Sequence, residues 1–290
     1  MLYDRIKNRN PINKGWSGDR KYCALDEAGN KYLLRIADIS QHERKLLEFE
    51  YMTKVDLLSL PICKPLEVGV CEDGVYSIQS WIEGKDMYDC MDGLSDTEIY
   101  NYGYMSGQIL KKMHSIPAPN NREDWARYFN RKADRKIQMY SECTVKHEKA
   151  EVFIDYINAH RYLLENRPQT FHHGDFHIGN MMISDTGSLY IIDFNRFDFG
   201  DPWEEFNRIV WMAEASHHLA RGVVDGYFEN NVPDEFWKLM ALYISSNTLG
   251  SLAWAERYGE EEIVTMRNQT NSILEWYDDM QLYVPKWYKK

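Results

Sequence analysis

The stretch that decides the fold is HGDFHIGN at residues 173–180, followed by IIDF at residues 191–194. In it, Asp175 stands five residues before Asn180, and Asp193 follows thirteen residues after Asn180. The residues between Asn180 and Asp193 read as two short strands around a tight turn at residues 185–188. Such a hairpin would bring Asn180 and Asp193 together, so their spacing has a geometric reason.

The residue types in this stretch fit the needs of phosphoryl transfer. That reaction requires a carboxylate that orients and deprotonates the attacking hydroxyl, and Asp175 fits this role. It also requires hard oxygen ligands that hold magnesium against the phosphates, and Asn180 and Asp193 fit that role. A competing interpretation makes a metal site from the histidines at 172, 173 and 177 together with Asp175, and we consider it much weaker.

The region before this stretch predicts a small lobe rich in strands. Two strands, GWSGDRKYCAL and KYLLRIAD, are joined at residues 26–30, and PLEVGVCEDGVYSIQSW reads as a hairpin that turns at Asp73–Gly74. Between them we predict one helix over residues 40–55, opened by a capping box of Ser40 and Glu43.

The rest of the chain predicts a larger, mostly helical lobe. A helix runs from a capping box at Ser95 and Glu98 to about residue 116, a charged helical region covers 121–166, and further helices follow residue 203. We therefore predict a nucleotide-binding lobe at 1–80, a hinge at 81–84, and a catalytic and acceptor-binding lobe at 85–290. Ligand sites favour clefts between lobes.

HGD followed by four residues and an Asn, then IDF, resembles the aminoglycoside phosphotransferase family, distant relatives of the protein kinases. The string GDPW at 200–203 resembles the family's continuation, and the likeness covers nearly the whole chain in order. It implies an α+β, protein-kinase-like bilobal fold with an antiparallel-sheet N-lobe and a larger helical C-lobe. It also implies ATP or GTP as donor, Mg²⁺, and transfer of the γ-phosphate to a hydroxyl of a small molecule.

Arg35, within LLRI, occupies the position at which the family has its phosphate-binding lysine. Glu48 on the following helix resembles the glutamate that pairs with that lysine, while Glu43 and Glu50 are competing partners. The change from Lys to Arg alters geometry, because a guanidinium is planar and longer than an ammonium. We expect Arg35, paired with Glu48, to grip the α- and β-phosphates.

Other positions also correspond to parts of the family's nucleotide site. Ser17 and Gly18, in the loop GWSGD, have backbone N–H groups that could cover the donor phosphates. The backbone of Ser80, Trp81 and Ile82 is expected to bind the adenine edge. His173 is expected to brace the catalytic loop through hydrogen bonds, as the family's motif histidine does.

Composition excludes several classes of protein. The net charge of −11 and the absence of a basic stripe argue against nucleic-acid binding. Five cysteines without a C-x-x-C motif indicate reduced thiols in a cytoplasmic protein rather than disulfides or structural zinc. No apolar stretch is long enough to cross a membrane, and the N-terminus does not resemble a signal peptide.

The sequence therefore predicts a monomeric, cytoplasmic kinase for a small, cationic hydroxyl acceptor such as an amino sugar, a function associated with antibiotic resistance. One alternative is a housekeeping kinase for choline, a sugar or an amino alcohol. Another is a nucleotide-binding module that transfers nothing; its support is Arg35 at the lysine position, and the intact set of Asp175, Asn180 and Asp193 argues against it.

Overall fold

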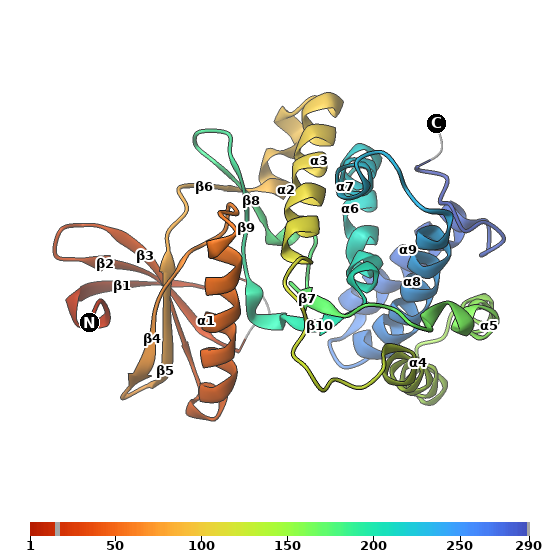
Figure 1. The fold of residues 1–290 in the computed structure, drawn as a ribbon, viewed down its shortest axis with the longest axis horizontal. Coiled ribbons are helices and arrows are strands. Elements are labelled where there is room, and N and C mark those ends of the chain that lie inside the picture. The colour runs from red at the N-terminus through yellow and green to blue at the C-terminus, as the bar shows by residue number, and fades with distance from the viewer. Residues whose placement is uncertain (15–17, 289–290) are drawn as a thin grey trace. The chain divides into compact units, whose positions relative to one another are not determined.

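The structure, a computed structural model, describes residues 1–14 and 18–288 and divides into two compact units. The first unit combines Met1–Asp92 with Gly179–Phe197, and the second combines Gly93–Ile178 with Asp198–Lys290. Each unit is therefore built from two separate parts of the chain (Figure 1).

The first unit contains a five-stranded antiparallel sheet. Its strands stand in the order β1-β2-β3-β5-β4, with the bounds Ile6–Ile12 (β1), Arg20–Asp26 (β2), Lys31–Ala37 (β3), Pro65–Cys71 (β4) and Gly74–Ser80 (β5). The strands β2 and β3 join at the predicted turn of residues 26–30, and β4 and β5 join at Asp73–Gly74, as the sequence indicates. The sheet buries an apolar cluster formed by Ala24, Leu34, Ile36, Tyr76 and Ile78.

The predicted helix of this unit is α1, His42–Leu57, which packs against β4 and β5 through buried Tyr51, Met52 and Val55. Its predicted capping box is wrong. Ser40 lies in a short 3₁₀ helix, Ile39–Gln41, in which the side chain of Asp38 accepts a hydrogen bond from the Ser40 N–H. The chain thus enters α1 through a 3₁₀ turn rather than directly from Ser40.

A second, three-stranded sheet of the first unit joins distant parts of the chain. It has the order β6-β8-β9, with the bounds Gly84–Asp86 (β6), Met181–Ser184 (β8) and Leu189–Ile191 (β9), and the short helix α2, Met87–Cys90, contacts β8. The turn between β8 and β9 is the predicted one, since Gly187 N–H donates to the Ser184 carbonyl at 2.8 Å. The hairpin therefore belongs to the unit that holds the large sheet.

The second unit is mostly helical. Its helices are α3 (Asp96–Met113), α4 (Trp125–Glu142), α5 (Glu151–His160), α6 (Ile209–Ala215), α7 (His217–Phe228), α8 (Asp234–Ala255) and α9 (Glu260–Tyr277). The predicted capping box at Ser95 and Glu98 is present at the start of α3. A short antiparallel pair, β7 (Thr170–His172) and β10 (Asp198–Gly200), and a 3₁₀ helix, Pro202–Arg208, lie around the HGD segment.

Helices α3 and α7 approach each other unusually closely because glycines line both of them. A Cβ on Gly107 of α3 would lie 2.1 Å from the Val223 carbonyl oxygen, and one on Gly226 of α7 would lie 2.0 Å from that of Tyr104. Larger side chains would hold the helices apart. The close contact fixes the end of α3, where His114 follows.

The predicted fold class is confirmed. One unit has a five-stranded antiparallel sheet and one long helix, and the other unit is larger and mostly helical. The compact units differ from the predicted boundaries, because residues 85–92 and 179–197 belong with the sheet. Within residues 1–14 and 18–288, no helix combines the length and the apolar character that a membrane span requires.

Candidate active site

Arg35 forms the centre of a charged network in the first unit. It is 2 % exposed, its Nε donates to Asp19 Oδ2 at 2.8 Å, and its Nη1 donates to Asp193 Oδ1 at 2.7 Å. Burial lowers the pKa of Arg35, but the carboxylates of Asp193, Glu48 and Asp19 outweigh burial and raise it overall. The guanidinium is therefore a permanently charged bridge between the start of β2 and the end of β9.

The predicted pairing of Arg35 with Glu48 is electrostatic in the described part of the chain: the Glu48 carboxylate raises the pKa of Arg35, while the ion pairs of Arg35 are with Asp19 and Asp193. Glu48 is buried on α1, where its Oε2 accepts a hydrogen bond from Lys45 Nζ at 2.9 Å. Lys45 also donates to Asp19 at 2.7 Å, so Asp19 lies between the two cations. Lys45 and Glu48 are three residues apart on one face of the helix, so they form an ion pair. Arg35 forms its ion pairs with Asp19 and Asp193.

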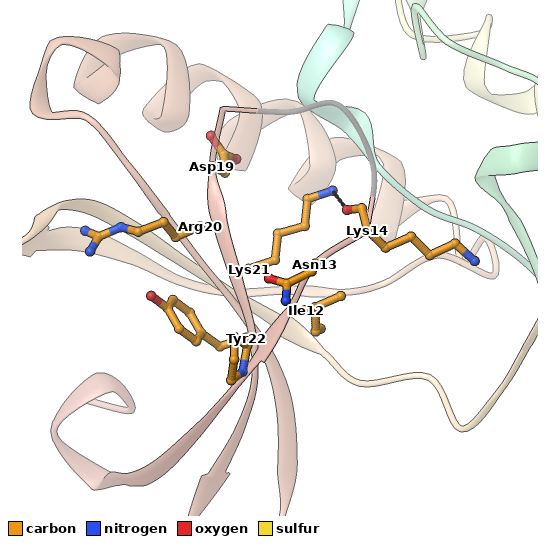
Figure 2. A pocket seen from close by; sticks show the side chains of 8 residues that line it. Ile12, Asn13, Lys14, Asp19, Arg20, Lys21 and Tyr22 are labelled. Carbon is orange, nitrogen blue, oxygen red and sulfur yellow. Dashed lines mark hydrogen bonds between the residues drawn. The ribbon is translucent and has the colours of Figure 1, made fainter. Parts of the chain in front are cut away.

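Lys21 adds a third cation to this network. It stands directly opposite Arg35 in the β2–β3 register, and its Nζ lies 3.8 Å from Asp193 Oδ2. The same Nζ donates to the Lys14 carbonyl at 3.2 Å, a bond that Figure 2 shows. Burial lowers the pKa of Lys21, with Asp193 acting in the opposite direction and Arg35 adding to the decrease.

The Lys21 side chain lines a pocket of about 300 Å³ at the ends of β1 and β2. Its walls are formed by Pro11, Ile12, Asn13, Lys14, Asp19, Arg20, Lys21 and Tyr22. Arg20 and Tyr22 leave the strand in other directions than Lys21, as the alternation of a strand requires (Figure 2). Lys21 thus combines access to a pocket with contact to the charged network.

The other predicted nucleotide contacts that the structure describes belong to the first unit. Ser17 lies outside the described residues. Gly18 begins the second described range, and a Cβ added there would meet no described atom within 4 Å. Ser80 ends β5, where its Oγ accepts from the Lys64 N–H at 2.8 Å, and Trp81 and Ile82 follow as half-buried residues.

The predicted magnesium ligands flank the two strands of one hairpin. Asn180 directly precedes β8 and Asp193 follows β9 by two residues, and the Ile192 N–H donates to the Asn180 carbonyl at 3.0 Å. Asp193 adopts a left-handed backbone conformation with φ 67°, which is uncommon for a residue other than glycine. Carboxylate and amide oxygens are ligands that suit Mg²⁺, so the donor set fits this ion.

In the second unit, Asp175 lies in the loop after β7 and is 16 % exposed. Its backbone N–H donates to His173 Nδ1 at 3.3 Å. One carboxylate oxygen lies 3.4 Å from Arg208 Nε, and the other lies 3.5 Å from His177 Nε2. The carboxylate is therefore accessible, oriented from two sides, and held beside a cation.

Glu205 fixes the backbone of the loop that carries Asp175. Its Oε2 accepts from the His173 N–H at 2.9 Å, and its Oε1 accepts from the Gly174 N–H at 2.5 Å. Behind it, His114 Nε2 lies 3.2 Å from Glu205 Oε2, and His114 Nδ1 lies 2.9 Å from the Tyr227 hydroxyl. Burial lowers the pKa of His114 to about 3, so a neutral imidazole donates to Glu205 and accepts from Tyr227.

The histidines near Asp175 have partners other than a metal. His172 Nδ1 lies 3.7 Å from Glu204 Oε2, and His173 accepts the Asp175 N–H. Across residues 1–14 and 18–288, no three His, Cys, Asp or Glu side chains are arranged to hold an ion. Asp201 is fully buried and caps the following 3₁₀ helix, with Arg167 and Tyr243 as further partners.

Several residues of these networks are absent from the sequence-based prediction. Asp19 lies within the quoted loop GWSGD, and Lys45 lies one helical turn before Glu48, so both have a local signal. Arg208, Glu205 and His114 have none. Glu205 contacts the HGD loop across 31 and 32 residues and Arg208 contacts it at Asp175, while His114 contacts Glu205 across 91 residues. Only the tertiary fold brings them together.

A comparison with families of known proteins gives one match over most of the chain. Residues 8–237 match the sequence profile of a family described as "Phosphotransferase enzyme family". No curated protein sequence matches the chain significantly.

Solved structures resemble the chain closely in fold and weakly in sequence. A thermostable mutant of aminoglycoside phosphotransferase APH(4)-Ia in its apo form has a TM-score of 0.66 and 18 % identity, with 94 % of this chain and 95 % of that chain covered. Amicoumacin kinase hAmiN, in complex with AMP-PNP, Ca²⁺ and Ami, has a TM-score of 0.65 and 13 % identity over 97 % and 90 % of the chains. The gentamicin complex of APH(2″)-IIa has a TM-score of 0.63 and 18 % identity over 98 % and 96 %.

Proposed function

The chain belongs to the phosphotransferase enzyme family and is a small-molecule kinase, and we propose that it transfers the γ-phosphate of ATP or GTP to a hydroxyl of a small molecule. The observation that carries this proposal is the assembly of Lys21, Arg35 and Asp193 beside the hairpin that also holds Asn180. Cations adjoining a potential metal ligand are what a nucleoside triphosphate requires.

For the chemical step, we assign the general base to Asp175. Its carboxylate would accept the proton of the acceptor hydroxyl as the oxygen attacks the γ-phosphorus. The hydrogen bonds from the loop backbone to Glu205 support this assignment, because they fix the segment on which Asp175 stands. Orientation of a base by a rigid loop contributes to catalysis through positioning.

For the donor side, we assign the phosphate contact to Lys21 and a framework role to Arg35. Arg35 is buried and already bridges two carboxylates, whereas Lys21 lines a pocket and approaches one carboxylate at 3.8 Å. Asn180 and Asp193 would hold Mg²⁺, which neutralises the charge of the phosphates. We keep the backbone of residues 80–82 as the proposed contact for the nucleotide base.

We further propose that the enzyme acts in the cytoplasm as a monomer. The five cysteines support the first part, because all of them are free thiols in the structure. The solved relatives named above include complexes with AMP-PNP and with gentamicin, which agrees with a nucleotide donor and a small acceptor.

The proposal is tested by Asp175→Asn in an assay of acceptor-dependent ADP release. We expect turnover to fall by roughly 10²–10⁴-fold, because the amide does not accept the proton, while nucleotide affinity stays within about threefold of wild type. Asp185→Asn, in the exposed turn between β8 and β9, is the matched control. If Asp175→Asn kept more than about a tenth of the wild-type turnover, Asp175 would not be the general base.

A further inference from the structure

Arg208 shares a helix face with the residue that fixes the loop carrying Asp175. Glu205 and Arg208 stand three residues apart in the 3₁₀ helix Pro202–Arg208, and side chains with this spacing lie above one another in a 3₁₀ helix. Glu205 accepts two backbone N–H groups of the loop, and the Nε atom of Arg208 lies 3.4 Å from Asp175 Oδ1. One face of this short helix therefore meets both the backbone of the loop and its carboxylate.

The guanidinium of Arg208 is engaged less than those of comparable arginines in the second unit. The four other half-buried arginines of this unit each donate at least one hydrogen bond to a described residue: Arg122, Arg161, Arg167 and Arg221. Among the same described residues, Arg208 donates no side-chain hydrogen bond, and its contact with Asp175 is an ion pair at 3.4 Å. Both Nη amino groups of Arg208 are therefore available to donate to a ligand.

Orientation of Asp175 alone explains this arrangement poorly. Glu205 already fixes the backbone of the loop. An arginine that holds a carboxylate commonly presents two parallel N–H groups to it, as Arg167 does to Asp201 at 2.7 and 3.0 Å. Arg208 forms no such pair of hydrogen bonds with Asp175, so most of its capacity to donate hydrogen bonds is unused.

The proposed reaction creates negative charge within reach of these N–H groups. The acceptor oxygen forms its bond to the γ-phosphorus, the bond from that phosphorus to the leaving oxygen of the nucleoside diphosphate breaks, and the hydroxyl proton passes to Asp175. During the transfer, negative charge is spread over the three non-bridging oxygens of the phosphoryl group. The acceptor oxygen must stand roughly 2.6–3.2 Å from the Asp175 carboxylate, so the phosphoryl group that bonds to it comes within reach of a guanidinium beside the same carboxylate.

We propose that Arg208 is a further catalytic residue, whose Nη groups donate hydrogen bonds to the non-bridging oxygens of the phosphoryl group during its transfer. This inference rests on the proposed phosphotransferase function and adds a residue to its chemical step. The phosphoryl group reaches the acceptor oxygen beside Asp175 only during the transfer, so the contact stabilises the transition state more than the bound nucleotide. Loss of Arg208 should therefore lower turnover and leave nucleotide affinity unchanged.

The test uses a transition-state analogue and requires no identified acceptor. Aluminium fluoride beside Mg·ADP mimics the phosphoryl group in transfer, with water in the place of the acceptor. The measured quantity is the rate at which the fluorescent nucleotide mant-ADP leaves the enzyme, with and without aluminium fluoride. We expect aluminium fluoride to slow this release roughly tenfold or more in wild type. In Arg208→Met the slowing should be lost, while release without aluminium fluoride stays within about twofold of wild type.

Arg221→Met is the matched control for this experiment. Arg221 on α7 pairs with Asp225 at the same Nε–carboxylate distance of 3.4 Å, and its side chain is 32 % exposed, against 25 % for Arg208. Its removal should leave the slowing as in wild type. Far-UV circular dichroism verifies the fold of each variant, and Arg208→Gln, which keeps a polar side chain beside Asp175, tests the same point if Arg208→Met is unstable.

A double-mutant cycle separates contact with the phosphoryl group from orientation of Asp175. Asp175→Asn should keep the slowing by aluminium fluoride, because Arg208 is still present, and adding Arg208→Met should remove it. If Arg208 acted only through Asp175, Asp175→Asn alone would remove the slowing and the second substitution would have no further effect.

The outcomes separate the two proposals. Undiminished slowing in the Arg208 variants, loss of slowing through Asp175→Asn alone, or no slowing in wild type would overturn the role of Arg208. Failure of the wild-type enzyme to bind mant-ADP would instead contradict the proposed phosphotransferase function.

Discussion

At the scale of single residues, Arg35 and Lys45 share the carboxylate of Asp19, and Arg35 extends this charged network to Asp193. Glu48 is buried on α1, whereas the competing candidates Glu43 and Glu50 are exposed. The sequence does not identify the hydrogen-bond partners of Arg35, because Asp19 lies 16 residues away, directly before β2, and Asp193 lies 158 residues away. Pairing between such segments depends on tertiary structure.

This network predicts different results for its two strand cations. Lys21→Met should raise the KM for ATP by roughly 10- to 100-fold with little loss of stability, because it removes a charge-assisted phosphate contact. Steady-state kinetics with varied ATP measure the effect, and Lys31→Met, which removes an exposed cation of β3, is the control. An unchanged KM for ATP in Lys21→Met would mean that Arg35, and not Lys21, contacts the phosphates.

Arg35→Met should instead lower the free energy of unfolding by about 3–5 kcal/mol, because it leaves two buried or half-buried carboxylates without their shared partner. Urea denaturation measures this loss. Arg35→Lys should lose less, since one ammonium keeps the charge but has no planar fork to bridge Asp19 and Asp193. A stable Arg35→Met protein would contradict the framework role.

His114 predicts a defined pH dependence of stability. Its pKa is about 3 when folded, against an ordinary value of 6.5, so the unfolded chain binds a proton first as the pH falls. The stability contributed by the neutral imidazole is complete above pH 6.5 and is lost as the pH falls toward 3. His114→Gln should therefore flatten the dependence by about 1.4 kcal/mol per pH unit in that window, measured by urea denaturation from pH 7 to 4.5.

At the scale of elements, local signals predict those elements whose formation is decided locally. The turn at Asp73–Gly74, the hairpin of β8 and β9, and the cap at Ser95 all depend on residues adjacent in sequence, and all are observed. The expected cap at Ser40 has the same pattern but fails, because Asp38 takes the Ser40 N–H first. A pattern of polar residues does not specify which of two competing caps forms.

The close packing of α3 and α7 supports the Asp175 loop through a chain of contacts. Tyr227 on α7 and His114 at the end of α3 are hydrogen-bonded, and His114 contacts Glu205, which holds the loop backbone. Gly107→Ala would push the helices apart, since its Cβ would lie 2.1 Å from the Val223 carbonyl oxygen. We expect a loss of about 1–3 kcal/mol of stability together with lower kcat.

Denaturant unfolding and steady-state kinetics of Gly107→Ala measure these two effects. Gly93→Ala is the control, because a Cβ at Gly93 meets no described atom within 4 Å. If Gly107→Ala had wild-type stability and kcat, the helix contact would have no influence on the loop.

At the scale of the whole molecule, the division of the chain into two units is the feature that sequence alone describes least well. The sequence predicts a boundary near residues 81–84, because the predicted strands give way to predicted helices there. The return of residues 179–197 to the first unit is invisible locally, since it depends on β8 pairing with β6 and on a bridge between Ile62 and Ile191. The functional boundary at 81–84 stays a prediction.

This discontinuity leads to a prediction about fragments. Residues 1–92 alone contain the large sheet and α1, yet Arg35 would lack Asp193, and Arg44 would lack the Asn195 and Phe197 carbonyls to which it donates. Strand β6 would also lose its pairing with β8. A buried charge deprived of one partner costs about 3–5 kcal/mol, which is much of the stability of a small domain. We therefore expect the fragment 1–92 to be largely unfolded, with few dispersed amide signals in its NMR spectrum.

The matched control joins residues 1–92 to 179–197 through a flexible Gly/Ser linker, and this chain should give a dispersed spectrum because it restores those partners. Arg35→Met in the linked chain should then return it toward the unfolded spectrum of the fragment. A fragment 1–92 that folds as well as the linked chain would mean that the hairpin of β8 and β9 contributes nothing to the first unit, and that the charged network forms only after folding.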